Sequence, residues 1–186
     1  MKSLSTVLLI SLLMFACSLP GSTSLADNSD PTVVPTVDLQ KYSGVWREIA
    51  HSPNFFQGSC VRSTAEYAVV AKDKISVHNV CFKANNRTSD IQGFASIPDM
   101  KVPAKLRVRF NFFARGDYWI TYLDPDYQWA VVSGPHKSSI FILARQAPMD
   151  LHLQSHIIRQ LDLAGYDTAH LIYDKYSSTE ESPSQL

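Results

Sequence analysis

The stretch that decides the fold of this chain reads VDLQKYSGVWREIA, residues 37–50. It joins a short polar turn to an isolated Gly44-x-Trp46, which opens a run of alternating side chains. A Trp at that place can plug the closed end of a small barrel, whose interior can just hold one small ligand. The stretch therefore predicts a container rather than an enzyme.

The composition fits one globular domain with short appendages. The chain has 186 residues, and 45% of them are hydrophobic, which is enough for a sizeable core. Seventeen basic residues balance seventeen acidic ones. Because there is no net charge, no overall field draws the protein onto nucleic acid, and no nucleic-acid partner is expected.

The N-terminus has the features of an export signal. Lys2 precedes an apolar run over residues 7–16, which Pro20 and Gly21 break. This run is shorter than the roughly 20 residues that a bilayer span needs. The sequence therefore predicts a signal peptide, which is excluded from the fold.

Two processing sites compete within this region. Residues 14–17, ending in Cys17, resemble the lipobox of bacterial lipoproteins; cleavage there would remove residues 1–16 and lipidate Cys17 at the cell outer membrane. Residues 24–26 form an ordinary small-x-small site, whose use would remove residues 1–26 and release a soluble periplasmic or secreted protein. Residues 27–36 are interpreted as a flexible linker in either case.

Alternation with period two dominates the rest of the chain. Residues 106–112, LRVRFNF, alternate apolar and polar side chains without a miss, as a strand with one buried face must. Similar runs occupy about 45–51, 61–70, 74–82, 89–97, 117–124, 128–134 and 139–145. Eight antiparallel strands at hairpin spacing predict an all-β, up-and-down β-barrel, because closure removes exposed sheet edges.

One helix is predicted after the strands, over about residues 148–164. Pro148 suits its first turn and Gly165 its end. It should pack outside the barrel through an apolar stripe of Leu153, Ile157, Leu161 and Ala164. The barrel domain then covers residues 37–174 with a last short strand near 171–173, and residues 175–186 are expected to be a disordered tail.

Cys60 and Cys81 remain in the chain whichever processing site is used. An exported protein meets an oxidising compartment, so a pair that flanks a predicted hairpin favours a structural disulfide. Simple alternation can place the two cysteines on opposite faces of their strands, which a β-bulge would reconcile.

From about residue 37 to residue 173, the chain resembles the lipocalins, in particular the branch of bacterial lipocalins, temperature-induced lipocalins and apolipoprotein D. Three separated motifs carry the resemblance: Gly44-x-Trp46, Asp124-Pro125-Asp126-Tyr127, and Arg145 at the end of Ile142–Arg145. One departure is Arg47, where the branch usually has Tyr; its side chain should face out of the barrel. The resemblance implies structural roles for Gly44, Trp46, Asp126, Tyr127 and Arg145, with Arg145 stacked on Trp46 at the barrel floor.

The resemblance also implies a function without catalysis. It predicts binding, storage or transport of small lipophilic molecules at the cell envelope, with a role in membrane maintenance. The ligands expected are fatty acids, such as palmitate, or lysophospholipids. The protein is expected to be a monomer or a homodimer. No cofactor is expected. The alternative is a lipocalin-fold enzyme acting on a lipophilic substrate with Cys60 as a free thiol.

Ligand contacts are expected from inward positions above the floor. Strand alternation selects Phe141, Leu143, Tyr118, Ile120, Tyr122, Leu106, Val108, Phe110, Phe112 and Glu48. A register wrong by one residue would instead select Trp119 and Thr121. Glu48 shares the face of Trp46, where a carboxylate needs a hydrogen bond or a polar head group.

No metal site is expected. His152 and His156 share a helix face at a spacing that can bind metal, but no third ligand is evident, and a solvated helix surface is favoured. The sequence also has no Gly-x-Ser-x-Gly, P-loop or HExxH motif.

Overall fold

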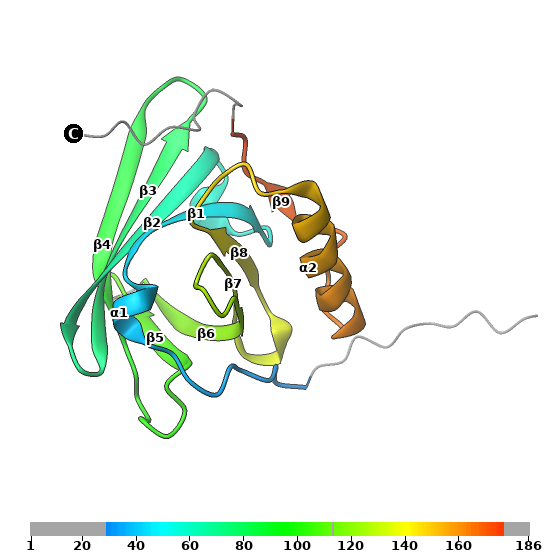
Figure 1. Cartoon of the computed structure of the whole chain (residues 1–186). Helices are drawn as coiled ribbons and strands as arrows, with labels where there is room; N and C mark the ends of the chain where they lie inside the picture. The colour runs from blue at the N-terminus through cyan, green and yellow to red at the C-terminus, as the bar shows by residue number, and fades with distance from the viewer. Residues whose placement is uncertain (1–28, 113, 177–186) are drawn as a thin grey trace, which may run out of the picture.

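The computed structural model describes residues 29–112 and 114–176. The predicted signal peptide, the lipidation of Cys17 and the tail from residue 177 onward therefore lie outside the described residues. Within them, antiparallel strands curl around a common axis and a single long helix lies outside (Figure 1).

Eight strands form the barrel. They are β1 (Gly44–His51), β2 (Cys60–Ala71), β3 (Lys74–Lys83), β4 (Thr88–Ser96), β5 (Lys105–Arg109), β6 (Arg115–Leu123), β7 (Trp129–Ser133) and β8 (Ile140–Ala144). From β2 to β8 each strand pairs with the next in the chain, and β1 pairs with both β8 and β2. The sheet thus closes on itself, which confirms the predicted up-and-down barrel.

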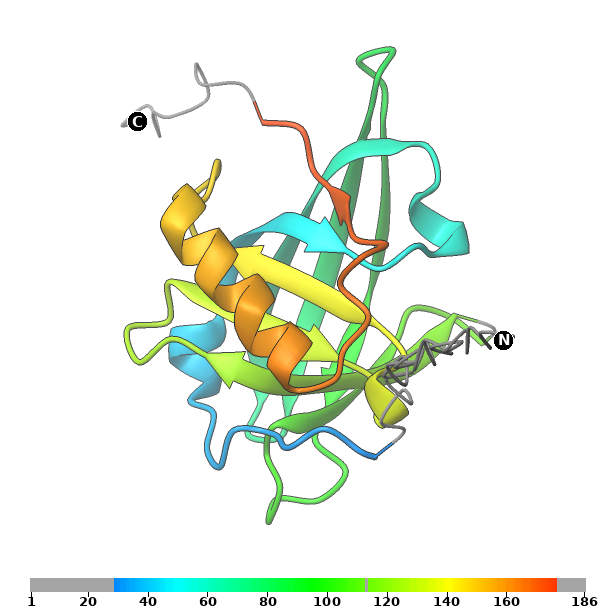
Figure 2. The same cartoon turned by 90° about the vertical axis from the view of Figure 1, so that its right-hand side faces the viewer.

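Two hydrophobic clusters lie on opposite sides of the barrel wall. The interior cluster includes Trp46, Tyr67, Leu106, Ile120 and Leu143, all buried. The outer cluster fills the space between the wall and the helix α2 (Leu151–Leu163), and includes Ile49, Ile140, Ile142, Ile157 and Leu161. Figure 2 shows α2 lying across this outer face.

The helix α2 begins three residues later than predicted. Asp150 is its N-cap, and the Asp150 side chain accepts hydrogen bonds from the backbone N–H groups of His152 and Leu153. Because this cap satisfies the first free donors of the helix, Pro148 and Met149 lie before it. None of the described helices is long and apolar enough to cross a membrane.

Residues 172–176 close the upper half of the seam between β1 and β2. β2 pairs only with Gly44–Arg47 of β1, while β9 (Ile172–Tyr173) pairs with Ala50 and His51. The chain then crosses to β2, because the backbone N–H of Lys175 donates to the Val61 carbonyl at 2.8 Å. Lys175, predicted to lie in a disordered tail, is therefore part of the barrel.

Tyr176 completes this closure. Its hydroxyl shares its one proton between the carbonyl oxygens of Glu48 on β1, at 2.8 Å, and Ser63 on β2, at 3.2 Å. We call residues 172–176 the closing segment. It supplies the backbone partners that the diverging strands β1 and β2 no longer offer each other.

The N-terminal segment also packs on the barrel. Val33 and Val34 contact the interior cluster, and the Val34 N–H donates to the Ile120 carbonyl at 3.0 Å. The described part of the predicted linker is therefore bound to the domain, because its valines bury apolar surface that a free tether would expose.

A disulfide joins Cys60 to Cys81, as predicted. The pairing of β2 with β3 shifts register between Cys60 and Arg62. This irregularity is the β-bulge that was expected to reconcile the faces of the two cysteines, since it brings both sulfur atoms to one side of the hairpin.

Candidate functional site

The barrel floor is built from Trp46 and Arg145. Trp46 is fully buried, and its indole N–H donates to the Tyr42 carbonyl at 2.7 Å. The Arg145 guanidinium carbon lies 3.8 Å from the centre of the Trp46 ring, a cation-π contact. The guanidinium also donates to four backbone carbonyl oxygens, those of Lys41, Ser43, Val45 and Tyr127.

The other motif residues tie this floor to its surroundings. Gly44 has a φ of +94°, a conformation that favours glycine, and it lets the chain turn from the helix α1 (Leu39–Tyr42) into β1. The Tyr127 hydroxyl accepts the Asp38 N–H at 2.9 Å. The second motif therefore fastens the β6–β7 turn to the start of α1.

Three tyrosine hydroxyls form a chain inside the barrel. Tyr42 and Tyr118 are 2.7 Å apart, and Tyr118 donates to Tyr67 at 3.0 Å. Since Tyr118 has one hydroxyl proton, Tyr42 must be the donor of the first bond, and the Tyr67 proton remains available to a further acceptor. Burial raises the pKa of all three hydroxyls, which therefore stay neutral.

Most of the predicted ligand contacts lie on the interior face. Leu106, Ile120 and Leu143 are buried in the interior cluster. Four further residues pack against that cluster but keep part of their surface accessible: Val108, Phe110, Tyr118 and Phe141. Part of the Val108 surface lines a hollow on the outer face of the barrel. The accessible surface of the other three indicates that the interior is not completely filled.

Tyr122 does not face the interior. The β6–β7 pairing shifts register between Ile120 and Tyr122, so Tyr122 joins the outer cluster and Leu123 takes the interior place. The alternative register, which selects Trp119 and Thr121, is wrong too. Trp119 lies on the outer face, with the Lys105 ammonium over its ring. The Thr121 hydroxyl donates to the Val131 carbonyl at 3.2 Å. A β-bulge depends on how a strand pairs with its partner, so the alternation of side chains within one strand does not reveal it.

Phe112 also departs from the prediction, since it is 79% exposed. β5 ends at Arg109, and the chain then turns, with the Phe110 N–H donating to the Ala114 carbonyl at 2.9 Å. The alternation of the sequence thus continues for three residues beyond the strand.

Glu48, His51 and Asp174 come together in the upper half of the interior, and we call them the acid–histidine cluster. Glu48 is 6% exposed, and the Gln57 side-chain amide donates to it at 2.7 Å. Burial raises the pKa of Glu48 to about 7. Burial and the nearby Glu48 raise the pKa of Asp174 to about 7.

Sequence reasoning found only Glu48 of this cluster. In a regular strand, residues three apart face opposite sides. The register of β1 against β8 shifts between Glu48 and Ala50, and this bulge turns His51 to the side of Glu48. Asp174 lies far away in the sequence, so no local pattern could have linked it to β1.

Asn79 is a second interior polar residue that the sequence reasoning missed. It pairs with Ala65 across β2 and β3, and Ala65 packs on the interior cluster. The Asn79 side-chain oxygen is buried and has no hydrogen-bond partner among the described residues. The sequence did contain a signal for it: Ile75, Val77 and Asn79 alternate along one strand and face inward, and Asn79 is the polar member of this series.

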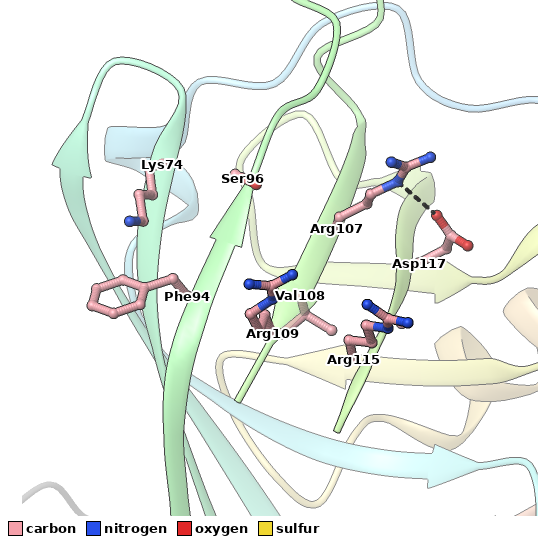
Figure 3. A pocket seen from close by; sticks show the side chains of 9 residues that line it. Lys74, Phe94, Ser96, Arg107, Val108, Arg109, Arg115 and Asp117 are labelled. Carbon is pink, nitrogen blue, oxygen red and sulfur yellow. Dashed lines mark ion pairs between the residues drawn. The ribbon is translucent and has the colours of Figure 1, made fainter. Parts of the chain in front are cut away.

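A hollow of about 710 Å³ lies on the outer face of the barrel, and we call it the outer basic hollow. Its side chains alternate with interior ones: Phe94 precedes buried Ala95, and Arg107 follows buried Leu106. Four cations line it, Lys74, Arg107, Arg109 and Arg115, against one acid, Asp117, which pairs with Arg107 at 3.7 Å (Figure 3). Its excess positive charge suits anions.

The histidines of α2 lie on its exposed face, His152 and His156 both being solvent-accessible. His78, on β3, pairs with Asp90 of β4 at 3.1 Å, also at the surface.

Comparison with known proteins identifies the family. The sequence model described as Lipocalin-like domain matches residues 37–176, about the whole of the described barrel. The chain is a lipocalin. This lipocalin is 32% identical to temperature-induced lipocalin-1 of Arabidopsis thaliana over 164 residues, which cover 83% of this chain and 88% of that protein.

A bacterial relative and a solved structure agree with this assignment. Outer membrane lipoprotein Blc of Vibrio cholerae is 28% identical over 166 residues, covering 88% of this lipocalin and 96% of the relative. Insecticyanin from the tobacco hornworm Manduca sexta matches with a TM-score of 0.64 at 21% identity, over 81% of this chain and 86% of that chain. The latter likeness shows the fold. Lipocalins in general bind small hydrophobic ligands in the barrel.

Proposed function

We propose that this lipocalin binds and carries single fatty acids, such as palmitate, or lysophospholipids in its barrel interior. The observation that carries the proposal is the set of apolar side chains that face the closed interior yet remain partly accessible, with Phe141 and Phe110 among them. Burial of an acyl chain yields about 0.8 kcal/mol per methylene, so about ten carbons suffice for micromolar binding after association costs.

Two polar groups support an amphiphilic ligand. The Tyr67 hydroxyl has a proton to donate, and the Asn79 side-chain oxygen can accept a hydrogen bond. Sites for small molecules combine an apolar lining with a few such polar groups, which orient the ligand.

Filling the interior tests this proposal. Ala65 and Ala68 lie on the same strand, but Ala65 packs on the interior cluster while Ala68 is exposed. Ala65→Phe should weaken binding of palmitate and lysophosphatidylcholine by about tenfold or more, equivalent to about 1.4 kcal/mol, whereas Ala68→Phe should not. The measurement is displacement of a fluorescent fatty acid, with melting curves to verify the fold. Wild-type protein that binds neither lipid would refute the proposal, as would equal affinities of the two variants.

The enzyme alternative depended on a free thiol at Cys60. That sulfur is bonded to Cys81 in this structure, so the proposed nucleophile is not available. Titration of thiols in the folded exported protein tests this point: a reactive Cys60 would restore the alternative.

We propose that the protein works at the cell envelope, either anchored to the outer membrane through lipidated Cys17 or soluble in the periplasm or outside the cell. The name of the Vibrio cholerae relative, outer membrane lipoprotein, supports the anchored form. Metabolic labelling with a fatty acid, compared between the natural chain and Cys17→Ser, distinguishes the two forms. Label in the natural chain alone would establish the anchor.

A further inference from the structure

The acid–histidine cluster has the geometry of a chelating site. Glu48 Oε1 and His51 Nε2 are 3.8 Å apart, and the donor atoms of the three side chains lie within 4.8 Å of one another. Bonds from Zn²⁺ to nitrogen or oxygen are about 2.0–2.2 Å, so two donors of a tetrahedral site lie about 3.4 Å apart. Glu48 and His51 are within about 0.4 Å of this separation, and Asp174 needs a side-chain shift of at most about 1.4 Å.

The hydrogen bonds of His51 present Nε2 as a ligand atom. Nδ1 lies 2.8 Å from the Ser52 carbonyl oxygen, which can only accept. The Asn54 amide nitrogen is also near Nδ1, but it already donates to the Ser52 carbonyl and to Gln57 Oε1. Nδ1 therefore carries the proton, and a neutral His51 directs the Nε2 lone pair toward Glu48. Ligand histidines are commonly oriented by such an Nδ1–H to carbonyl bond.

The fold brings these donors together by two separate devices. The bulge in β1 turns His51 to the face of Glu48. The closing segment places Asp174 beside them, held by the bond from its backbone N–H to the Ile49 carbonyl and by the Ser63 N–H, which donates to its carboxylate. Bulges often re-aim a side chain next to a functional site.

The charges of the cluster favour a cation. Two carboxyl groups share one interior region, with Glu48 buried and Asp174 half-buried. Two carboxylates at this separation repel each other when both are ionised. A bound divalent ion would relieve this repulsion.

We propose that Glu48, His51 and Asp174 bind one divalent transition-metal ion in the upper half of the barrel interior. One imidazole and two carboxylates, without a thiolate, match Zn²⁺ or Mn²⁺. The Gln57 amide and the Ser63 N–H are the outer partners that hold the two carboxylates in place.

Calorimetric titration of the full chain with Zn²⁺, after removal of metal with a chelator, tests the site. We expect one ion to bind per chain with a dissociation constant in the micromolar range or below. His51→Asn, Glu48→Gln and Asp174→Asn should each weaken this event by about tenfold or more, the usual scale for loss of about 1.4 kcal/mol or more.

Two control variants distinguish zinc binding at the acid–histidine cluster from zinc binding at the protein surface. His78→Asn removes a surface histidine that also faces a carboxylate, and the double variant His152→Asn/His156→Asn removes the helical pair. Both should leave the affinity unchanged. Loss of binding in the helical variant, with full binding in His51→Asn, would overturn the proposal, as would a wild-type chain that binds neither Zn²⁺ nor Mn²⁺.

A second measurement guards against variants that fold poorly. In the wild-type chain, Zn²⁺ should shift the ¹⁵N resonance of His51 Nε2 and raise the melting temperature, because an ion that binds only the folded state stabilises it. In Asp174→Asn the rise should be much smaller. A His51 resonance that does not move at saturating zinc would contradict the site even if the chain is fully folded.

Discussion

At the scale of single residues, Arg145 joins segments that are far apart in the chain. Its guanidinium covers the Trp46 ring and donates to carbonyl groups of both the α1–β1 region and the β6–β7 turn. A planar fork with five N–H donors can do this, whereas an ammonium group cannot reach the same acceptors together.

Replacing Arg145 by lysine should therefore destabilise the protein although the charge is kept. We expect Arg145→Lys to lower the free energy of unfolding by about 2–4 kcal/mol, since several bonds from a charged donor are lost. Urea unfolding measures this loss, with Arg107→Lys on the exposed outer face as the matched control. The order of preference among ligands should survive, because Arg145 lies at the floor; an altered preference would contradict this role.

Glu48 should make the stability of the metal-free protein depend on pH. Burial raises its pKa from 4.5 to about 7, so between these values the folded chain holds a proton that the unfolded chain has released. The free energy of unfolding is then highest below about pH 4.5 and falls as pH rises from about 4.5 to about 7, by about 3 kcal/mol from this group. Asp174, with its pKa also near 7, adds in the same direction.

Urea unfolding in the presence of EDTA, from about pH 4 to about pH 8, measures this dependence. Glu48→Gln should flatten the decline, whereas Glu66→Gln, on an exposed position of β2, should not. An unchanged slope in Glu48→Gln would assign the dependence to other groups.

At the scale of the elements, the period of the sequence predicts which segments are strands but not where their faces change. All eight barrel strands and α2 lie within about three residues of where alternation and helical spacing placed them. The bulges at Ile49 and after Ile120 are different, because each depends on the partner strand across the ladder. One shift sent Tyr122 to the outside and the other brought His51 inside. The other errors have separate causes: β5 ends before Phe112, and Asp174 lies too far along the chain for a local pattern to link it to β1.

The docking of α2 rests on buried leucine and isoleucine side chains. Leu161 is fully buried against the barrel wall, while Leu163 on the same helix is 78% exposed. Leu161→Ala should lower the free energy of unfolding by about 2–5 kcal/mol because it leaves a cavity, and Leu163→Ala should change it by less than about 0.5 kcal/mol. Chemical denaturation of both variants checks this; similar losses would mean that α2 packs through another face.

At the scale of the whole molecule, the barrel depends on a closure that its eight strands do not complete alone. Tyr176→Phe removes the hydroxyl that bonds to both Glu48 and Ser63. We expect amide hydrogen exchange at Asp174 and Lys175 to accelerate about fivefold, corresponding to about 1 kcal/mol of lost local stability. Tyr173→Phe, in the same segment, is the control; equal protection in both variants would show that the backbone bonds suffice.

The order of this closure along the chain has a consequence for biosynthesis. Because the closing segment follows every barrel strand in the sequence, β1 and β2 leave the ribosome long before residues 172–176 can join them. A nascent chain therefore keeps an open upper seam until translation has passed Tyr176, and its strand edges there are free to pair with other chains in the meantime. Final protection against proteases at this seam is gained only after translation has passed that point.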